Sequence, residues 1–95
     1  MPSICRQGDL CTGHGCFPPR ANVQGSGDVF INSIPAHRQG DAWETHCCKK
    51  ACHDSVLASG SSAAFVNGRA LGRVGDSVAC GSSVATGSSD VFADG

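Results

Sequence analysis

Short apolar runs alternate along this chain with turn signals made of asparagine, serine and glycine. The run from Asp28 to Ile31 is followed by Asn32-Ser33, and a matching run around Phe65 is followed by Asn67-Gly68. Each pattern predicts a small β-hairpin with a two-residue turn. The 13 glycines, the 4 prolines and the lack of tyrosine leave little material for helices, so we expect an all-β fold.

Three copies of the pattern Arg-x-Gly-Asp divide the sequence into blocks, and these copies are Arg6–Asp9, Arg38–Asp41 and Arg73–Asp76. The second and third blocks align without gaps at an offset of 35 residues. A fixed period of this length is typical of a repeat protein. In each copy we expect the glycine to adopt a positive φ and the aspartate to cap the turn that follows it.

The last residues, 87–95, repeat the opening of a block, so the chain begins with the end of one block and finishes with the start of another. This order predicts that the C-terminal segment pairs near the N-terminus and closes a ring of three blocks with pseudo-threefold symmetry. Phe30, Phe65 and Phe92 occupy equivalent positions in the blocks. We expect these three side chains to be buried together as the main apolar layer of the core.

Histidine and cysteine side chains fall at nearly equivalent points after the repeated aspartates. His14 and His46 lie five residues beyond their aspartates, and Cys80 lies four residues beyond its own. Such side chains converge on a pseudo-threefold axis, and His53, seven residues after His46, is the best candidate for a fourth ligand. Three neutral imidazoles and one thiolate suit a closed, structural zinc site. His37 lies inside a predicted strand, and we do not expect it to bind metal.

The other six cysteines lie in the first two blocks, and they are Cys5, Cys11, Cys16, Cys47, Cys48 and Cys52. Three alternatives stay open for them: up to three disulfides, a second sulfur-rich metal site, or reduced and buried thiols. A chain of 95 residues forms at most one domain with a thin core, so a metal or disulfides must add to its stability. We expect residues 1–95 to form that single domain.

Charge and hydropathy exclude several classes of protein. Seven Lys and Arg residues against eight Asp and Glu residues leave no basic stripe for a phosphate backbone, so we expect no nucleic-acid partner. No stretch approaches the roughly 20 apolar residues of a membrane span, so we expect no stable membrane insertion. The start of the chain lacks the apolar run of a secretory signal, which predicts assembly in the cytoplasm.

The segment Pro35-Ala36-His37-Arg38 resembles the Pro-Ala-Ala-Arg signature of PAAR-repeat proteins, with one position changed. The Gly-Ser lead-ins, the Arg-x-Gly-Asp exits and the segment 78–81 extend the resemblance over essentially the whole chain. It implies a cone of short β-hairpins with zinc near the apex, held by three histidines and one cysteine. It also supports His53, because the family places a histidine in the loop after its motif. The extra cysteines depart from the family pattern.

The resemblance implies a protein without enzymatic activity that caps the homotrimeric VgrG-type spike of a bacterial type VI secretion system, one cap per trimer. It would sharpen the spike, aid membrane puncture and effector delivery, and leave the cell on the spike tip. Because the three blocks fill the sequence, we expect no effector extension, and effector proteins would travel on other spike components. The alternatives are the tip of a contractile phage tail spike, a small zinc-binding nucleic-acid module, and a redox module that uses Cys47 or Cys48.

Overall fold

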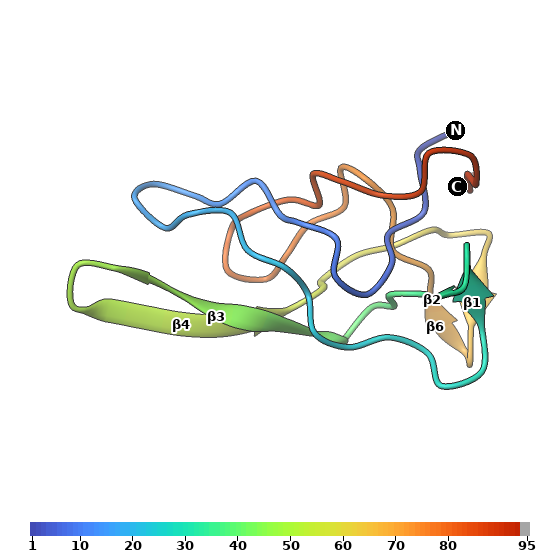
Figure 1. Cartoon of the computed structure of the whole chain (residues 1–95), viewed down its shortest axis with the longest axis horizontal. Coiled ribbons are helices and arrows are strands. Elements are labelled where there is room, and N and C mark those ends of the chain that lie inside the picture. The colour runs from blue at the N-terminus through green and yellow to red at the C-terminus, as the bar shows by residue number, and fades with distance from the viewer. Residues whose placement is uncertain (94–95) are drawn as a thin grey trace.

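The computed structural model describes residues 1–93, and Asp94 and Gly95, the end of the repeated segment 87–95, lie outside the described residues. Within residues 1–93 there is no helix, and the strands form three two-stranded antiparallel sheets (Figure 1). The sheets are β1 (Phe30–Ile31) with β2 (Ile34–Pro35), β3 (Ala42–Cys48) with β4 (Ala51–Val56), and β5 (Phe65–Val66) with β6 (Arg69–Ala70). The predicted all-β fold of short hairpins is confirmed.

The turns of the β1–β2 and β5–β6 hairpins lie where the sequence predicted them. Asn32 and Ser33 join β1 to β2 with φ of 56° and 66°, and Asn67 and Gly68 join β5 to β6 with φ of 55° and 76°. A two-residue turn with positive φ at both positions matches the right-handed twist of the strands on either side. Asparagine and glycine adopt this conformation more readily than other residues, which is why the sequence reveals both turns.

The longest hairpin, β3–β4, lies where the sequence analysis expected only a loop after the second Arg-x-Gly-Asp. Its turn consists of Lys49 and Lys50, with Lys49 at a φ of 59°. Two lysines are not a usual hairpin signal, so the turn could not be found from its residue types. The register of the two strands places His46 directly opposite His53. This hairpin therefore brings together two histidines that are seven residues apart in the sequence.

Backbone hydrogen bonds close the three blocks into a ring. The N–H of Cys5 donates to the carbonyl of Gly72 (2.8 Å), that of Gly72 donates to His37 (2.9 Å), and that of His37 donates to Cys5 (3.1 Å). These three residues are equivalent, because each directly precedes the arginine of its block. Ser3 pairs with Phe92 in an antiparallel bridge. The predicted pairing of the C-terminal segment near the N-terminus is thus confirmed.

The Arg-x-Gly-Asp segments form three matching turns. Their glycines have the predicted positive φ, at 93° for Gly8, 87° for Gly40 and 95° for Gly75. The prediction that the aspartate caps the following turn is wrong. In every copy the carboxylate instead accepts the backbone N–H of the arginine three residues earlier, at 2.8 Å. The positive φ reverses the chain, and the carboxylate then lies against the start of its own turn.

The molecule is elongated, with principal extents of 38 × 24 × 21 Å. Figure 1 shows the β3–β4 turn and the loop formed by residues 12–19, the apex loop, extending together at one end, which we call the apex. At the opposite end lie the β1–β2 and β5–β6 hairpins. We call these two hairpins, with the bridged residues Ser3 and Phe92, the base.

Two apolar clusters make up the core. Toward the base, small and branched side chains pack together, and these are Ile4, Ala36, Val66, Leu71 and Ala93. Toward the apex, a second cluster contains larger side chains and two cysteines, and these are Cys5, Cys11, Trp43, Leu57, Val78 and Val84.

The prediction that Phe30, Phe65 and Phe92 are buried together is wrong. Their exposed fractions are 52%, 60% and 44%. Residues on both sides of each phenylalanine face inward, as Val29 and Ile31 do around Phe30. Because successive side chains of an extended chain point to opposite faces, each phenylalanine faces outward. The three equivalent positions do share one environment, which is the surface of the base.

Candidate metal site

Four side chains from all three blocks meet near the apex. His14 comes from the apex loop, and His46 and His53 come from β3 and β4. Cys80 comes from a turn in which the N–H of Gly81 donates to the carbonyl oxygen of Val78 at 2.9 Å. One ligand atom from each of these four residues lies within 4.8 Å of the others. The structure therefore brings together the four residues that were expected to bind zinc, as a group that could hold a metal ion.

The spacing of the donor atoms suits a tetrahedral ion. His53 Nε2 lies 2.6 Å from His46 Nε2 and 3.1 Å from His14 Nε2. Zinc bonds of about 2.0 to 2.1 Å to nitrogen and about 2.3 Å to sulfur place neighbouring donors roughly 3.3 to 3.6 Å apart. Small outward movements of the imidazoles would produce those separations, so the residues present fit such an ion.

The tautomer of His46 is also suited to metal binding. Its Nδ1 lies 2.9 Å from the carbonyl oxygen of Pro18, an atom that can only accept a hydrogen bond. The proton of neutral His46 is therefore on Nδ1, and Nε2 keeps its lone pair for a metal. Histidine ligands are commonly held in this way, by a hydrogen bond from the other ring nitrogen.

Cys80 has the chemistry of a thiolate ligand. Burial opposes ionisation, but hydrogen bonds from Ser82, Arg20 and His53 outweigh it and lower the pKa of Cys80 from 9.0 to about 5. The sulfur lies 3.6 Å from Ser82 Oγ and 3.4 Å from Arg20 Nη2. Since the thiolate rather than the thiol binds metals, this environment prepares the sulfur for coordination near neutral pH.

Phe17 is a part of the site that the sequence analysis missed. Its ring centroid lies 4.3 Å from that of His53 and 4.8 Å from those of His14 and His46. Its backbone pairs with that of His14 through two hydrogen bonds of 2.8 and 3.1 Å. The ring therefore packs against all three imidazoles. No repeat signal could have identified it, because Phe17 has no equivalent phenylalanine in the other blocks.

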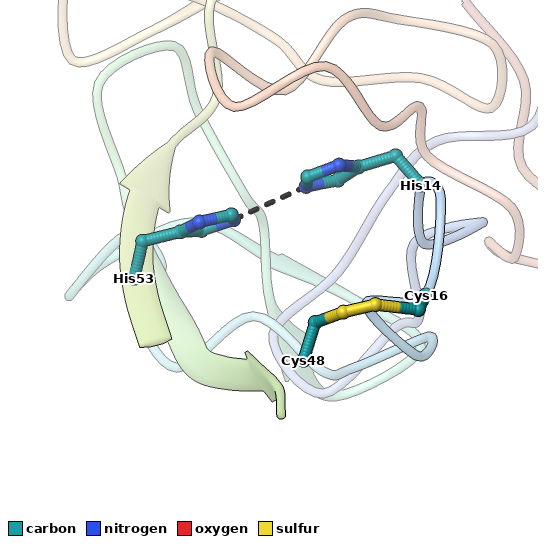
Figure 2. Close-up of a disulfide and its surroundings, with 4 residues drawn as sticks. All are labelled: His14, Cys16, Cys48 and His53. Carbon is teal, nitrogen blue, oxygen red and sulfur yellow. Dashed lines mark hydrogen bonds between the residues drawn. A yellow bond between two sulfur atoms is a disulfide. The ribbon is translucent and has the colours of Figure 1, made fainter. Parts of the chain in front are cut away.

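Two disulfides lie in the apex region, and one of them is next to the site. Figure 2 shows that the bond between Cys16 and Cys48 lies close to His14 and His53. It joins the apex loop to β3 across a sequence separation of 32 residues. The second disulfide joins Cys47 to Cys52, which are directly opposite each other in the β3–β4 hairpin. The sequence left three alternatives open for the cysteines, and these four form disulfides.

The other two cysteines are free and buried within the core. Burial raises the pKa of Cys5 above its usual range. For Cys11, burial is outweighed by hydrogen bonds from Arg20, Ser82 and Gly13, which lower its pKa. Within residues 1–93 the group formed by the three histidines and Cys80 is the one that could hold a metal, so no second sulfur-rich site is present there.

His37 lies outside the metal group, which agrees with its predicted position inside a strand. It is fully buried, and its Nδ1 donates to the carbonyl oxygen of Gln24 at 2.7 Å. Its ring packs edge-on against Trp43, with 5.2 Å between the centroids. His37 is therefore a core residue at the position where the Pro-Ala-Ala-Arg signature has its second alanine.

Comparison with known proteins agrees with this architecture. A sequence model of the PAAR motif matches residues 12–86. The chain belongs to the PAAR motif family. The resemblance found in the sequence is thus confirmed, and the match spans the apex loop, the second and third Arg-x-Gly-Asp turns and all four residues of the metal group.

Several relatives of this PAAR chain are toxins. Double-stranded DNA deaminase toxin A of Burkholderia cenocepacia is 36% identical over 76 residues, which cover 77% of this chain and 5% of the toxin. In Pseudomonas aeruginosa, NAD(P)(+) glycohydrolase toxin Tse6 and (p)ppApp synthetase toxin Tas1 are each 29% identical over 79 residues, or 77% of this chain and 18% of each toxin. The PAAR chain thus spans less than a fifth of the length of these curated relatives. Among its described residues, no helix has the length and apolar character needed to cross a membrane.

Proposed function

We propose that this PAAR chain is a zinc-bound, non-enzymatic tip that caps the homotrimeric VgrG-type spike of a bacterial type VI secretion system, one cap per trimer. The observation that carries this proposal is the base, where each of the three blocks exposes one equivalent phenylalanine. Phe30, Phe65 and Phe92 have 52%, 60% and 44% of their surface exposed. Three large apolar side chains exposed at one end of a small protein would suit an interaction surface.

The symmetry of the base suggests the symmetry of its partner. The hydrogen-bonded ring of Cys5, His37 and Gly72 gives the three blocks equivalent backbone positions, although they belong to one chain. A homotrimer offers three identical surfaces around its axis, and each can meet one block in the same way. The end of such a trimer also has strand edges and apolar side chains to cover. A single pseudo-threefold chain is therefore a suitable cap.

Zinc bound by His14, His46, His53 and Cys80 would have a structural role. Three imidazoles and one thiolate fill all four positions of a tetrahedral ion, which leaves no position for a reactive water. Phe17 packs against all three imidazoles, so the proposed ion would lie next to its ring. A metal would add bonds that join the three blocks at this end, and would keep the tip rigid during membrane puncture.

The relatives suggest what the spike delivers. Three toxins contain a segment similar to this chain within a much longer protein. We propose that residues 1–95 form one PAAR domain, which assembles on the spike in the cytoplasm and is exported with it. Effector proteins carried by other spike components would then enter the target cell with the tip.

Native mass spectrometry of the chain mixed with the VgrG-type protein of the same genome tests the stoichiometry. We expect one chain per trimer, with one zinc ion per chain by metal analysis of the same complex. Replacing Phe30, Phe65 and Phe92 together by serine should abolish the complex. A matched control replaces three apolar residues that are exposed outside the base, Leu10, Val23 and Val56, and should bind normally. Three caps on one trimer, or a triple phenylalanine variant that still binds, would contradict the proposal.

A further inference from the structure

Arg20 is a buried arginine whose partners are unusual. Only 5% of its surface is exposed, yet none of its nitrogen atoms lies within 4.0 Å of a carboxylate oxygen in residues 1–93. The arginines of the repeats differ in this respect, since Arg6, Arg38 and Arg73 each form an ion pair with the aspartate of their own turn. Because a buried charge is costly unless it is compensated, the groups around Arg20 must supply that compensation.

The groups that face the guanidinium are two sulfur atoms. Arg20 Nη1 donates to Cys11 Sγ at 3.1 Å, and Nη2 donates to Cys80 Sγ at 3.4 Å. Cys80 belongs to the metal group, whereas Cys11 lies in the core beside it. The two arms of the guanidinium thus connect one sulfur of the candidate metal site to one sulfur of the core.

Three further contacts fix the direction of this side chain. Arg20 Nε donates to the carbonyl oxygen of Glu44 at the start of β3, and the guanidinium carbon lies 5.6 Å from the ring centroid of buried Trp43. The backbone N–H of Arg20 donates to Cys11 Sγ at 3.4 Å. These contacts hold the planar fork of arginine in one orientation, with Nη2 directed at Cys80. A lysine has no such fork and would fix the sulfur less well.

We propose that Arg20 is a positioning residue for the metal site, which holds the sulfur of Cys80 toward the three imidazoles and raises the affinity for the bound ion. The inference rests on the proposed zinc site. A hydrogen bond to the ligand sulfur restricts its rotation, and this fixed orientation favours the bound ion. It also withdraws electron density from the lone pairs of the sulfur, which a charge-transfer spectrum can detect. Outer contacts of this kind typically change metal affinity by about 10- to 100-fold.

The test uses the folded chain loaded with Co²⁺, because cobalt bound to sulfur gives a charge-transfer band that zinc lacks. In Arg20→Met we expect metal affinity, measured by competition with a chelator, to fall about 10- to 100-fold. We also expect the sulfur-to-cobalt band to move to longer wavelength, since the lone pairs of Cys80 lose a hydrogen-bond donor. Arg20→Lys should lie between the wild type and Arg20→Met in both measurements.

Arg69→Met is the matched control, because Arg69 also donates to a backbone carbonyl and lies at the base, away from the metal group. It should leave the affinity and the cobalt band unchanged. If Arg20→Met lowers only the melting temperature and keeps both metal properties, Arg20 merely supports packing and the proposal is wrong. Should Arg20→Met fail to fold, Arg20→Lys with wild-type affinity and band would overturn it equally. A wild-type chain that binds no Co²⁺ would instead refute the metal site itself.

Discussion

The base and the apex of this molecule differ in how closely they follow the repeat. At the base, equivalent residues of different blocks make the same contacts. Asn67 Nδ2 donates to Asp28 Oδ1 at 2.8 Å, and Asn32 Nδ2 donates to Asp90 Oδ1 at 2.8 Å. At the apex, the three blocks contribute segments that differ in length and in residues. One supplies the His14 loop, the next supplies a long hairpin with two histidines, and the third supplies a short turn with Cys80.

The partners proposed for the two ends would account for this difference. A surface that met a trimer would benefit from three equal contacts, and such contacts would require the repeats at the base to stay alike. A tetrahedral ion needs four ligands, and three equivalent positions supply only three. The β3–β4 hairpin resolves this conflict, because its second strand returns His53 to the site opposite His46. With a bound ion as proposed, the symmetry would be broken where three blocks supply four ligands.

Removal of the metal should have the largest effect, and it should affect the two ends unequally. Metal binding contributes on the order of 10 kcal/mol in small zinc domains. We expect a chelator, or His46→Ala, to lower the melting temperature strongly and to increase hydrogen exchange in β3 and β4 first. Amides of the hydrogen-bonded ring of Cys5, His37 and Gly72 should remain protected for longer. His37→Ala, which removes a histidine outside the site, should keep its full metal content; loss of metal there would contradict the assignment.

The second comparison concerns the stability contributed by a buried side chain and by an exposed side chain of the same end of the molecule. Leu71 is 5% exposed and packs in the basal cluster, whereas Phe65 is 60% exposed. We expect Leu71→Ala to cost about 2 to 5 kcal/mol of unfolding free energy. Phe65→Ala should change it by about 0.5 kcal/mol or less, as for other surface positions. Denaturant titration of both variants measures these values, and a strongly destabilised Phe65→Ala would show that the phenylalanine contributes to the core after all.

The phenylalanines also show what repeat equivalence can and cannot reveal. Alignment placed Phe30, Phe65 and Phe92 in one environment, which is correct, but it could not say which side of the strand faces inward. That information was present in the alternation of the neighbouring residues. Around a narrow threefold axis, valine, isoleucine and alanine fit together, and three phenylalanine rings do not.

The turn signals predicted two of the hairpin turns, and the repeats predicted the closed ring and three of the four residues that the structure brings together. The fourth, His53, was chosen for its proximity to His46 and was supported by the family resemblance. The contacts that surround those residues could not be predicted, because they break the repeat. Phe17 lies in the apex loop and Arg20 directly follows it, in the segment 10–24, which has no counterpart of similar length in the third block. The bond between Cys16 and Cys48 also depends on how that loop folds onto β3, which no sequence spacing determines.

The two disulfides allow a sharper test of the apex. In the chain-entropy model, a loop of 32 residues contributes about 3.7 kcal/mol and a loop of 5 residues about 2 kcal/mol. We therefore expect the double variant Cys16→Ser, Cys48→Ser to be less stable than Cys47→Ser, Cys52→Ser. The first pair should also release metal faster, because it frees the loop that carries His14. Equal stability and equal metal release in the two variants would show that this disulfide does not secure the loop.

The smallest effect that we expect is a pH dependence of stability that arises from His37. His37 is fully buried, and burial lowers its pKa. The hydrogen bond to Gln24 and the charge of Asp41 oppose this shift, while the charges of Arg38 and Arg69 add to it.

The unfolded chain therefore takes up a proton near the ordinary histidine pKa of about 6.5, whereas the folded chain resists protonation until the pH is lower. Because the unfolded state then binds more protons, the contribution of neutral His37 to stability is complete above pH 6.5 and declines as the pH falls below it.

Melting temperatures of the metal-loaded wild type and His37→Ala, followed from pH 8 to pH 5, measure this contribution. The metal ligands are the same in both proteins, so the difference between their two pH curves reports the protonation of His37. We expect the wild type to lose more stability than the variant on acidification, and parallel curves would mean that protonation of His37 is not linked to folding.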